Sequence, residues 1–357
     1  MRKSFIISME VLAAISAVIG LYFGWRYFLK PVVFPTPKAA PTEIPEEKLK
    51  AVSAGRAVNY WVNRQTNNIY YINDTGEVYK ITQEGQDEKV ISLNLKNIHF
   101  ADPSPDQTKV LIAFGYPYQT VFTIFDSSDN SSMPLPEGAT AATWDSSSTK
   151  IAYLKTNGGA SALNILNLAD KKSKEILKLA QKDLDLKWIA PEEIYLIQKP
   201  SALVSNQLWS FDLDKKTLRA IIKDEAGLML NWSPDGQSAL KFTGNSINNR
   251  LDLIDKNNNL LANITPTTLP SKCLYVTDKI YCAAPETMPS RTILPDDYLS
   301  KKIYSRDDFY VLELAEGFFA PIFFGSDVKI DATNLSIEGN RLLFINRYDQ
   351  RIYSLEL

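Results

Sequence analysis

The sequence predicts an all-β fold, a seven-bladed β-propeller that is preceded by a single transmembrane α-helix and a Pro-rich stalk. Three observations support this prediction. An apolar run lies near the start, short β-branched and aromatic runs follow between Asn, Asp, Gly and Ser clusters, and one anchor position recurs at nearly constant spacing. We place the transmembrane anchor at residues 1–30, the Pro-rich linker at 31–47 and the propeller at 48–357.

The apolar run, FIISMEVLAAISAVIGLYFGW, covers 21 residues from Phe5 and holds one charged residue, Glu10. A helix needs about 20 apolar residues to cross the hydrocarbon layer. Large residues rather than small ones follow the run, which favours an uncleaved anchor over a signal peptide. We therefore expect the chain to contact the cytoplasmic membrane through residues 5–28. Basic residues flank the run on both sides, so charge alone does not set the orientation.

The next segment, PVVFPTPKAAPTEIP, contains five prolines in 15 residues from Pro31. Pro-rich chains are extended and semi-rigid, with a rise of about 3.1 Å per residue, so this one reaches about 45 Å. We predict a stalk that holds the following domain away from the bilayer.

The repeat begins after the stalk. Its anchor positions are separated by 42, 41, 44, 44, 43 and 60 residues, and they are Trp61, Pro103, Trp144, Trp188, Trp232, Tyr275 and Leu335. A period of about 40–45 residues is typical of propeller blades with four antiparallel strands. Seven blades of about 44 residues need roughly 310 residues, and residues 48–357 supply 310.

The fifth unit illustrates the predicted blade. GLMLNW forms the inner strand, QSALKF the second, NRLDLID the third and NLLANIT the outer strand, with SPDG and KNNN as turns. The last unit ends on its third strand, RIYSLEL, so it lacks an outer strand. KLKAVS, at residues 48–53, can fill that place and close the ring, which would remove the open sheet edges.

WSPDG, from Trp232 to Gly236, and PSPD, from Pro103, connect the innermost strand of a blade to the next strand. These motifs resemble the WD40-like (PD40-type) repeats of the TolB family, which also occur in the propellers of prolyl oligopeptidases. By period the resemblance covers nearly the whole region after the stalk. It implies a propeller fold, and it is the basis for expecting a bacterial protein.

Both cysteines lie in SKCLYVTDKIYCAAP. If Thr277 and Asp278 form a two-residue turn, Cys273 and Cys282 face each other as a non-hydrogen-bonded pair. Cα atoms in such a pair lie about 4.5 Å apart, within the disulfide range. We predict a disulfide and therefore an oxidising compartment outside the cytoplasm.

Composition excludes several function classes. A net charge of −2 and a pI near 5.7 provide no basic face for phosphates, so we expect no nucleic-acid partner. His99 is the single histidine, which removes most histidine-based catalysis, and we interpret it as a structural residue of an inner strand. No motif for nucleotides, metals or a nucleophile occurs. We predict no cofactor, no metal site and no catalytic residue, hence not an enzyme.

The gap of 60 indicates an insertion of about 16–18 residues between the second and third strands of the sixth blade, within residues 284–302. Loops longer than about 12–15 residues are uncommon unless they are functional. GYPYQ and KPSALVSNQ should lie on the same face of the propeller. The residue types suit a protein contact, and the candidate binding residues are Tyr116, Tyr118, Met288, Arg291, Asp296 and Tyr298.

We predict a membrane-anchored, single-pass, extracytoplasmic propeller that acts as a protein-binding or scaffold module of a bacterial cell envelope, with an envelope protein as partner. Two alternatives stay open. A carbohydrate-active or hydrolytic enzyme would need an acidic channel site with two carboxylates about 5–9.5 Å apart. A pilus-associated minor subunit is suggested because Glu10 resembles the glutamate near the start of the apolar helix of type IV pilins, although it falls sixth from Phe5 rather than fifth.

Overall fold

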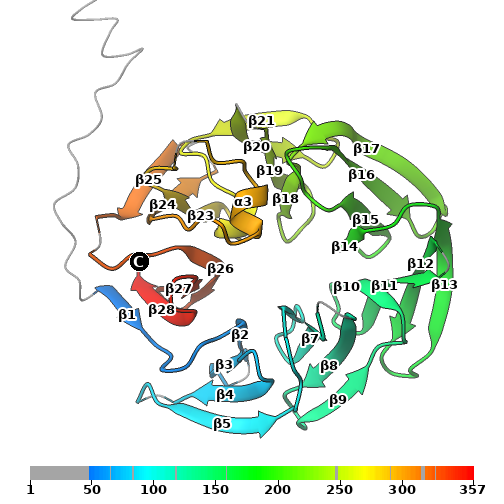
Figure 1. Cartoon of the computed structure of the whole chain (residues 1–357), viewed down its shortest axis with the longest axis horizontal. Helices are drawn as coiled ribbons and strands as arrows, with labels where there is room; N and C mark the ends of the chain where they lie inside the picture. Colours follow the sequence, from blue (N-terminus) through cyan, green and yellow to red (C-terminus); the bar gives the residue numbers. More distant parts are fainter. Residues whose placement is uncertain are drawn as a thin grey trace, which may run out of the picture. The chain divides into compact units, whose positions relative to one another are not determined.

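The computed structural model shows seven four-stranded antiparallel sheets arranged in a ring (Figure 1). A cavity lined by inner strands lies within the ring, and we call this central region the channel. It describes residues 48–64, 66–82, 84–116, 119–157, 159–245, 248–289, 291–314, 318–325 and 327–357. The prediction of an all-β, seven-bladed propeller is confirmed. The predicted anchor and linker, residues 1–47, lie outside the described residues, and no helix among the described residues is long and apolar enough to cross a membrane.

Six blades are built from consecutive strands, ordered from the channel outward. Blades 1 to 3 comprise β2 (Asn59–Val62), β3 (Ile69–Ile72), β4 (Glu77–Ile81) and β5 (Asp87–Ser92); β6 (Phe100–Pro103), β7 (Lys109–Phe114), β8 (Val121–Asp126) and β9 (Ser131–Pro134); and β10 (Ala139–Trp144), β11 (Lys150–Asn157), β12 (Ala160–Asn167) and β13 (Ser173–Leu179). Blades 4 to 6 comprise β14 (Leu184–Ala190), β15 (Glu193–Gln198), β16 (Ser205–Asp212) and β17 (Thr217–Ala226); β18 (Met229–Trp232), β19 (Ser238–Gly244), β20 (Asn249–Asp255) and β21 (Leu260–Ile264); and β22 (Cys273–Val276), β23 (Lys279–Pro285), β24 (Asp307–Glu313) and β25 (Phe318–Phe323).

Blade 7 joins the two ends of the ring. Its first three strands are β26 (Ala332–Glu338), β27 (Arg341–Asn346) and β28 (Arg351–Glu356), and its outer strand is β1 (Leu49–Ala51), which pairs antiparallel with β28. Ser53 reinforces the junction, because its Oγ accepts a hydrogen bond from the Ile352 backbone N at 2.9 Å and its carbonyl accepts one from Arg351 Nε at 2.8 Å. The predicted closure is thus present.

The WSPDG and PSPD turns are built in the same way. In each turn the serine Oγ lies close to the aspartate Oδ1, at 2.6 Å for Ser233 and Asp235 and at 2.5 Å for Ser104 and Asp106. In WSPDG the last residue must be glycine for two reasons. Gly236 has φ +67°, and a Cβ there would meet Ile189 Cγ2 of blade 4 at 2.4 Å. The turn therefore also fits blade 5 against its neighbour.

Aromatic side chains pack between the sheets, as the repeat predicts. The Trp232 ring of blade 5 meets the Tyr195 ring of blade 4 edge-on, with centroids 4.7 Å apart. Polar links also recur at the period of the repeat. Asn59 Nδ2 donates to the Ala101 carbonyl and Asn231 Nδ2 donates to the Cys273 carbonyl at 2.9 Å, and each pair is 42 residues apart. Both side-chain packing and hydrogen bonds therefore join neighbouring blades of the ring.

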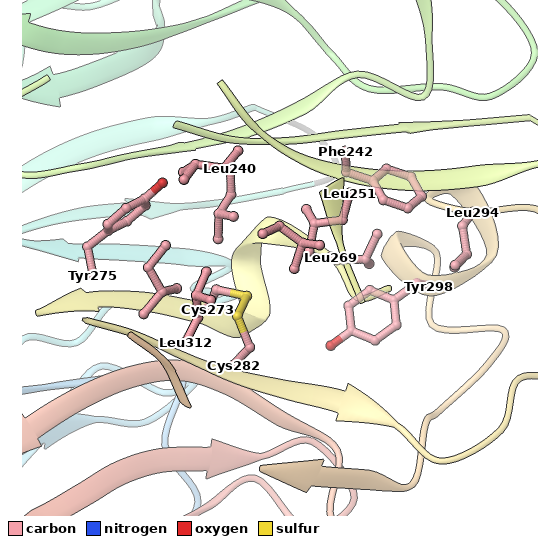
Figure 2. Close-up of a cluster of buried hydrophobic side chains, with 13 residues drawn as sticks. Leu240, Phe242, Leu251, Leu269, Cys273, Tyr275, Cys282, Leu294, Tyr298 and Leu312 are labelled. Atoms are coloured by element: carbon pink, nitrogen blue, oxygen red, sulfur yellow. A yellow bond between two sulfur atoms is a disulfide. The ribbon is translucent and has the colours of Figure 1, made fainter. Parts of the chain in front are cut away.

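The two cysteines lie in β22 and β23, directly opposite each other in the register, and a disulfide joins them with a Cα–Cα distance of 4.1 Å. Thr277 at the turn has φ +51°, which is consistent with the two-residue hairpin. Figure 2 shows the disulfide inside the buried cluster between blades 5 and 6, which also includes Leu240, Phe242 and Leu312.

Candidate functional site

The two ends of the propeller differ. Because each blade is antiparallel, the loops between second and third strands lie at the same end as the connections from one blade to the next. We call this end the loop face, and the opposite end, which carries the turns between first and second strands, the turn face. The described residues of GYPYQ, of KPSALVSNQ and of the insertion fall on the loop face, as predicted.

Exposed apolar side chains gather on the loop face. Among the described residues, the exposed large apolar side chains fall into two groups. One group lies along the outermost strands of the blades: Val90, Leu218, Leu260 and Leu261. The other lies in or beside the loops of the loop face: Phe100, Tyr116, Leu203, Val204, Leu299, Tyr304, Val328 and Tyr348. Leu203 is 73% exposed and Tyr116 62%. Within this set, the turn face carries none.

The insertion, residues 286–306 of blade 6, lies across the neighbouring blade. It includes the one-turn helix α3 (Asp296–Leu299). The Asp296 carboxylate accepts hydrogen bonds from Ser201 Oγ at 2.9 Å and from the Ala202 backbone N at 2.6 Å, both in a loop of blade 4. The segment before α3 lies on blade 5, where a Cβ on Gly244 would meet the Leu294 carbonyl oxygen at 2.8 Å. The insertion therefore links blades 4, 5 and 6.

A buried charge cluster fixes the other side of the insertion. Lys272 precedes β22, and its Nζ lies 2.6 Å from Asp307 Oδ2, 2.6 Å from Asp331 Oδ1 and 2.8 Å from Ser305 Oγ. The Tyr298 hydroxyl of α3 donates to Asp331 Oδ1 at 3.1 Å. Lys272, Asp307 and Asp331 are each at most 4% exposed, so the blade 6–blade 7 junction contains a desolvated ion network.

The electrostatics of the cluster follow from this geometry. Burial alone would lower the pKa of Lys272, but the Asp307 and Asp331 carboxylates hold it above its ordinary value. Burial raises the pKa of Tyr298 to about 12, so its hydroxyl keeps its proton and acts as a donor. Arg347 covers the Tyr298 ring at 3.8 Å and pairs with Asp331 Oδ2 at 2.8 Å. Burial also raises the pKa of Asp307, and the charge of Lys272 opposes this rise. Through these contacts the cluster holds the insertion against blade 7.

The structure separates the predicted binding residues. Asp296 is committed to the blade 4 loop, Tyr298 is buried in the charge cluster, and Met288 is half-buried against the core between blades 5 and 6. Arg291 is exposed on the insertion with φ +67°. Tyr116 is exposed on blade 2, so the structure does not place these residues in a single contact site.

Tyr118 and His99 are the other two residues of blade 2 that the sequence analysis named. Tyr118 lies outside the described residues. His99 precedes β6 instead of lying within it, and it is exposed beside Tyr116 with ring centroids 5.5 Å apart, which corrects the interpretation as an inner-strand residue.

Sequence reasoning missed the charge cluster and most of the exposed apolar group. Opposite charges at equivalent positions would have indicated the cluster, because Lys272 and Asp331 each come directly before the inner strand of consecutive blades. Tyr304 and Tyr348, whose rings lie 5.2 Å apart, come from separate blades, so nothing in the local sequence predicts their contact.

A second candidate site is the channel cavity, which we define by its lining from the inner strands β2, β6, β22 and β26 and from adjacent turns. Its volume is about 670 Å³, within the range of small-molecule sites. Asp102 of β6 lines the cavity, and burial raises its pKa, although the attraction of Lys187 partly opposes this. The described residues contain no group of three His, Cys, Asp or Glu side chains that could hold a metal ion.

No protein-family model matches the sequence, and no curated protein matches it significantly. Solved structures match the fold. An oligogalacturonate lyase from Vibrio parahaemolyticus aligns with a TM-score of 0.62 and 12% identity, over 86% of this chain and 93% of that one. The β-propeller domain of the Trilobed protease from Pyrococcus furiosus aligns with a TM-score of 0.55 and 11% identity, over 81% and 90% of the two chains.

TolB from Acinetobacter baumannii is also similar, with a TM-score of 0.47 and 12% identity over 84% of this chain and 63% of TolB, less than two thirds of its length. At these identities the likenesses show the fold alone. The lyase and the propeller domain of the protease therefore define the class of this protein as a β-propeller and nothing finer.

Proposed function

We propose that this protein is a membrane-anchored, extracytoplasmic protein-binding module of a bacterial cell envelope, and that its loop face carries the contact. The observation that carries the proposal is the gathering of exposed apolar and aromatic side chains on that face. Apart from those on the outer strands, they come from loops of blades 2, 4, 6 and 7. Aromatic anchors with a polar surround are typical of protein interfaces.

The way the loops are held supports this role. The insertion ties the blade 4 loop to the blade 6–blade 7 junction through Asp296 at one side and Tyr298 at the other. Loops that are fixed before binding lose little conformational entropy when a partner docks. Leu203, Val204 and Leu299 lie on elements that this tether joins, and they form the part of the loop face that we expect to contact the partner first.

The location is part of the same proposal. A stalked anchor at residues 1–47 would hold the propeller outside the cytoplasm, and the Cys273–Cys282 disulfide suits an oxidising compartment. Thiol alkylation tests this location if the cells are first quenched with acid and the protein is alkylated in denaturant, because both cysteines are buried in the folded protein. A disulfide in the cell leaves both cysteines unlabelled until reductant is added. Labelling of both thiols without reductant would contradict it.

The binding experiment compares two matched double variants of the full-length protein after crosslinking in intact cells. Leu203→Glu with Val204→Glu changes the loop face, where these residues are 73% and 58% exposed. Leu260→Glu with Leu261→Glu changes the outer strand of blade 5, where they are 57% and 56% exposed. We expect a companion protein that crosslinks to the wild type and to the outer-strand variant but not to the loop-face variant. Equal crosslinking of both variants would refute the loop face as the contact.

A further inference from the structure

We propose that the channel cavity binds a small organic cation, a primary ammonium or guanidinium group, and that Asp102 is the residue that recognises it. This site lies in the channel, is separate from the loop face, and does not depend on the function proposed above. The cavity of about 670 Å³ is large enough for a ligand of this kind.

The Asp102 carboxylate is a charged acceptor without a close partner. Asp102 lines the cavity. Among the described residues, no group donates a hydrogen bond to this carboxylate and no cation lies in ion-pair contact with it. Lys187 attracts it only from a distance. A partly buried carboxylate without a donor is costly for a folded protein, and a ligand that brings its own N–H donors removes that cost.

Strand β6 holds the main chain of Asp102 firmly. The indole Nε1 of Trp144 in blade 3 donates to the Asp102 carbonyl at 2.9 Å. Asp102 also pairs with Leu111 in the register of β6 and β7. The main chain at this position is therefore fixed from two sides, so the carboxylate is presented to the cavity by a rigid element.

Several of the polar groups near Asp102 are already engaged with one another. Asn59 Nδ2 donates to the Ala101 carbonyl, and Asn59 Oδ1 accepts from Asn334 Nδ2 at 3.0 Å. The Tyr60 hydroxyl donates to the Asn334 carbonyl at 2.8 Å. Trp61 also lines the cavity, and its buried Nε1 has no hydrogen-bond partner among the described residues, so the cavity offers a neutral donor as well. The unpartnered acceptor with a full charge is the Asp102 carboxylate, and that charge favours a ligand that donates.

The other charged side chains that line the cavity do not reverse this preference. They are Arg64, which follows β2, and Glu338, at the end of β26, and they have opposite signs. With Asp102, the lining therefore carries two negative charges and one positive charge, and this excess favours a cation over an anion.

The test is calorimetric titration of the full chain, solubilised in detergent, with defined probes. Cadaverine represents a free diamine, agmatine a free guanidinium compound and the peptide Gly-Lys-Gly a basic side chain, while 1,5-pentanediol is the neutral control. We expect at least one cationic probe to bind and the diol not to bind. If cadaverine or agmatine binds and the peptide does not, the ligand is a free amine; the reverse result indicates a basic segment of a partner.

Two variants assign the site. Asp102→Asn keeps the shape and removes the charge, and we expect it to weaken binding of the cation about tenfold or more. Asp185→Asn removes another inner-strand carboxylate that does not line the cavity, and we expect a change of less than about twofold. Equal loss in both variants, unchanged binding in Asp102→Asn, diol binding as tight as diamine binding, or no cation binding at about 10 mM would overturn the proposal.

Discussion

The Asp296 carboxylate and Ser201, 95 residues apart in the sequence, are joined by a 2.9 Å hydrogen bond from Ser201 Oγ. The same carboxylate accepts from the backbone N of Ala202. This link joins a loop of blade 6 to a loop of blade 4 and so spans blade 5, which lies between them. It makes the insertion a cross-brace of the loop face.

Asp296→Ala should loosen both loops. The variant loses two hydrogen bonds and leaves the Ala202 N–H without an acceptor, so we expect the free energy of unfolding to fall by about 1–3 kcal/mol. Hydrogen–deuterium exchange should increase in residues 199–206 and 294–300. Asp214→Ala, in an exposed turn on the other face, is the control and should change neither quantity. Unchanged exchange in the two loops would show that the hydrogen bonds do not hold them.

Lys272→Met should be among the most destabilising single changes. It leaves Asp307 and Asp331 buried without their shared cation, and breaking a buried pair in this way costs about 3–5 kcal/mol. Burial raises the pKa of Asp307 above its unfolded value of about 3.9, and removing Lys272 removes the attraction that opposes this rise. The variant's loss of unfolding free energy is therefore largest at pH 7. It becomes smaller as the pH falls toward 4, because protonation removes the buried charge.

Urea unfolding of the wild type and of Lys272→Met at pH 7 and at pH 4.5 measures this difference. Lys279→Met, which removes a solvent-exposed pair with Glu313, is the matched control and should cost less than about 1 kcal/mol at either pH. A loss for Lys272→Met that does not depend on pH would contradict the electrostatic explanation.

The disulfide should stabilise the blade 5–blade 6 core. It closes a segment with a sequence separation of nine residues, for which chain-entropy arguments give about 2.5–3 kcal/mol. We expect the double variant Cys273→Ser with Cys282→Ser to unfold at lower urea, and reductant to shift the wild type to about the same midpoint. Reductant should leave the double variant unchanged. A wild type insensitive to reductant after full reduction, verified by mass, would contradict this contribution.

Asp102→Asn should stabilise the ligand-free protein. Burial raises the pKa of Asp102, so its ionised form costs stability. That cost is absent below the unfolded pKa of about 3.9 and complete above the folded pKa. We therefore expect the variant to gain about 0.5–2 kcal/mol at pH 7 and to lose this gain toward pH 4. Thermal unfolding at both pH values is the measurement, and a lower midpoint at pH 7 would contradict the cost that we assign to this carboxylate.

The sequence was sufficient to predict the architecture because each blade of a propeller repeats the same short pattern of strands and turns. The recurring aromatic position, with Trp144, Trp188 and Trp232 each 44 residues apart, marks the same packing place in successive blades. Counting outward from the turn at Thr277 placed Cys273 opposite Cys282 without any tertiary knowledge. Closure by residues 48–53 followed from a missing outer strand.

The loop face could not be predicted in the same way. Tyr298 has the composition of an interface residue, but contacts with Lys272 and Asp331 bury it, and these partners lie 26 and 33 residues away. Asp296 finds its partner two blades back. Such contacts depend on how the ring brings distant loops together, so local composition identified the right segment without separating its exposed residues from its internal ones.

Blade 7 combines a strand from the start of the ring with three strands from its end, and this arrangement determines the order in which the ring can form during synthesis. β1 leaves the ribosome before every other strand of the ring, yet its partner β28 is the last of them to be made. β1 therefore stays unpaired while six blades form, and the ring can close only when residues 351–356 have been synthesised. A chain that stops short of them would retain exposed strand edges on both β27 and β1, which would distinguish an incomplete molecule from a finished one.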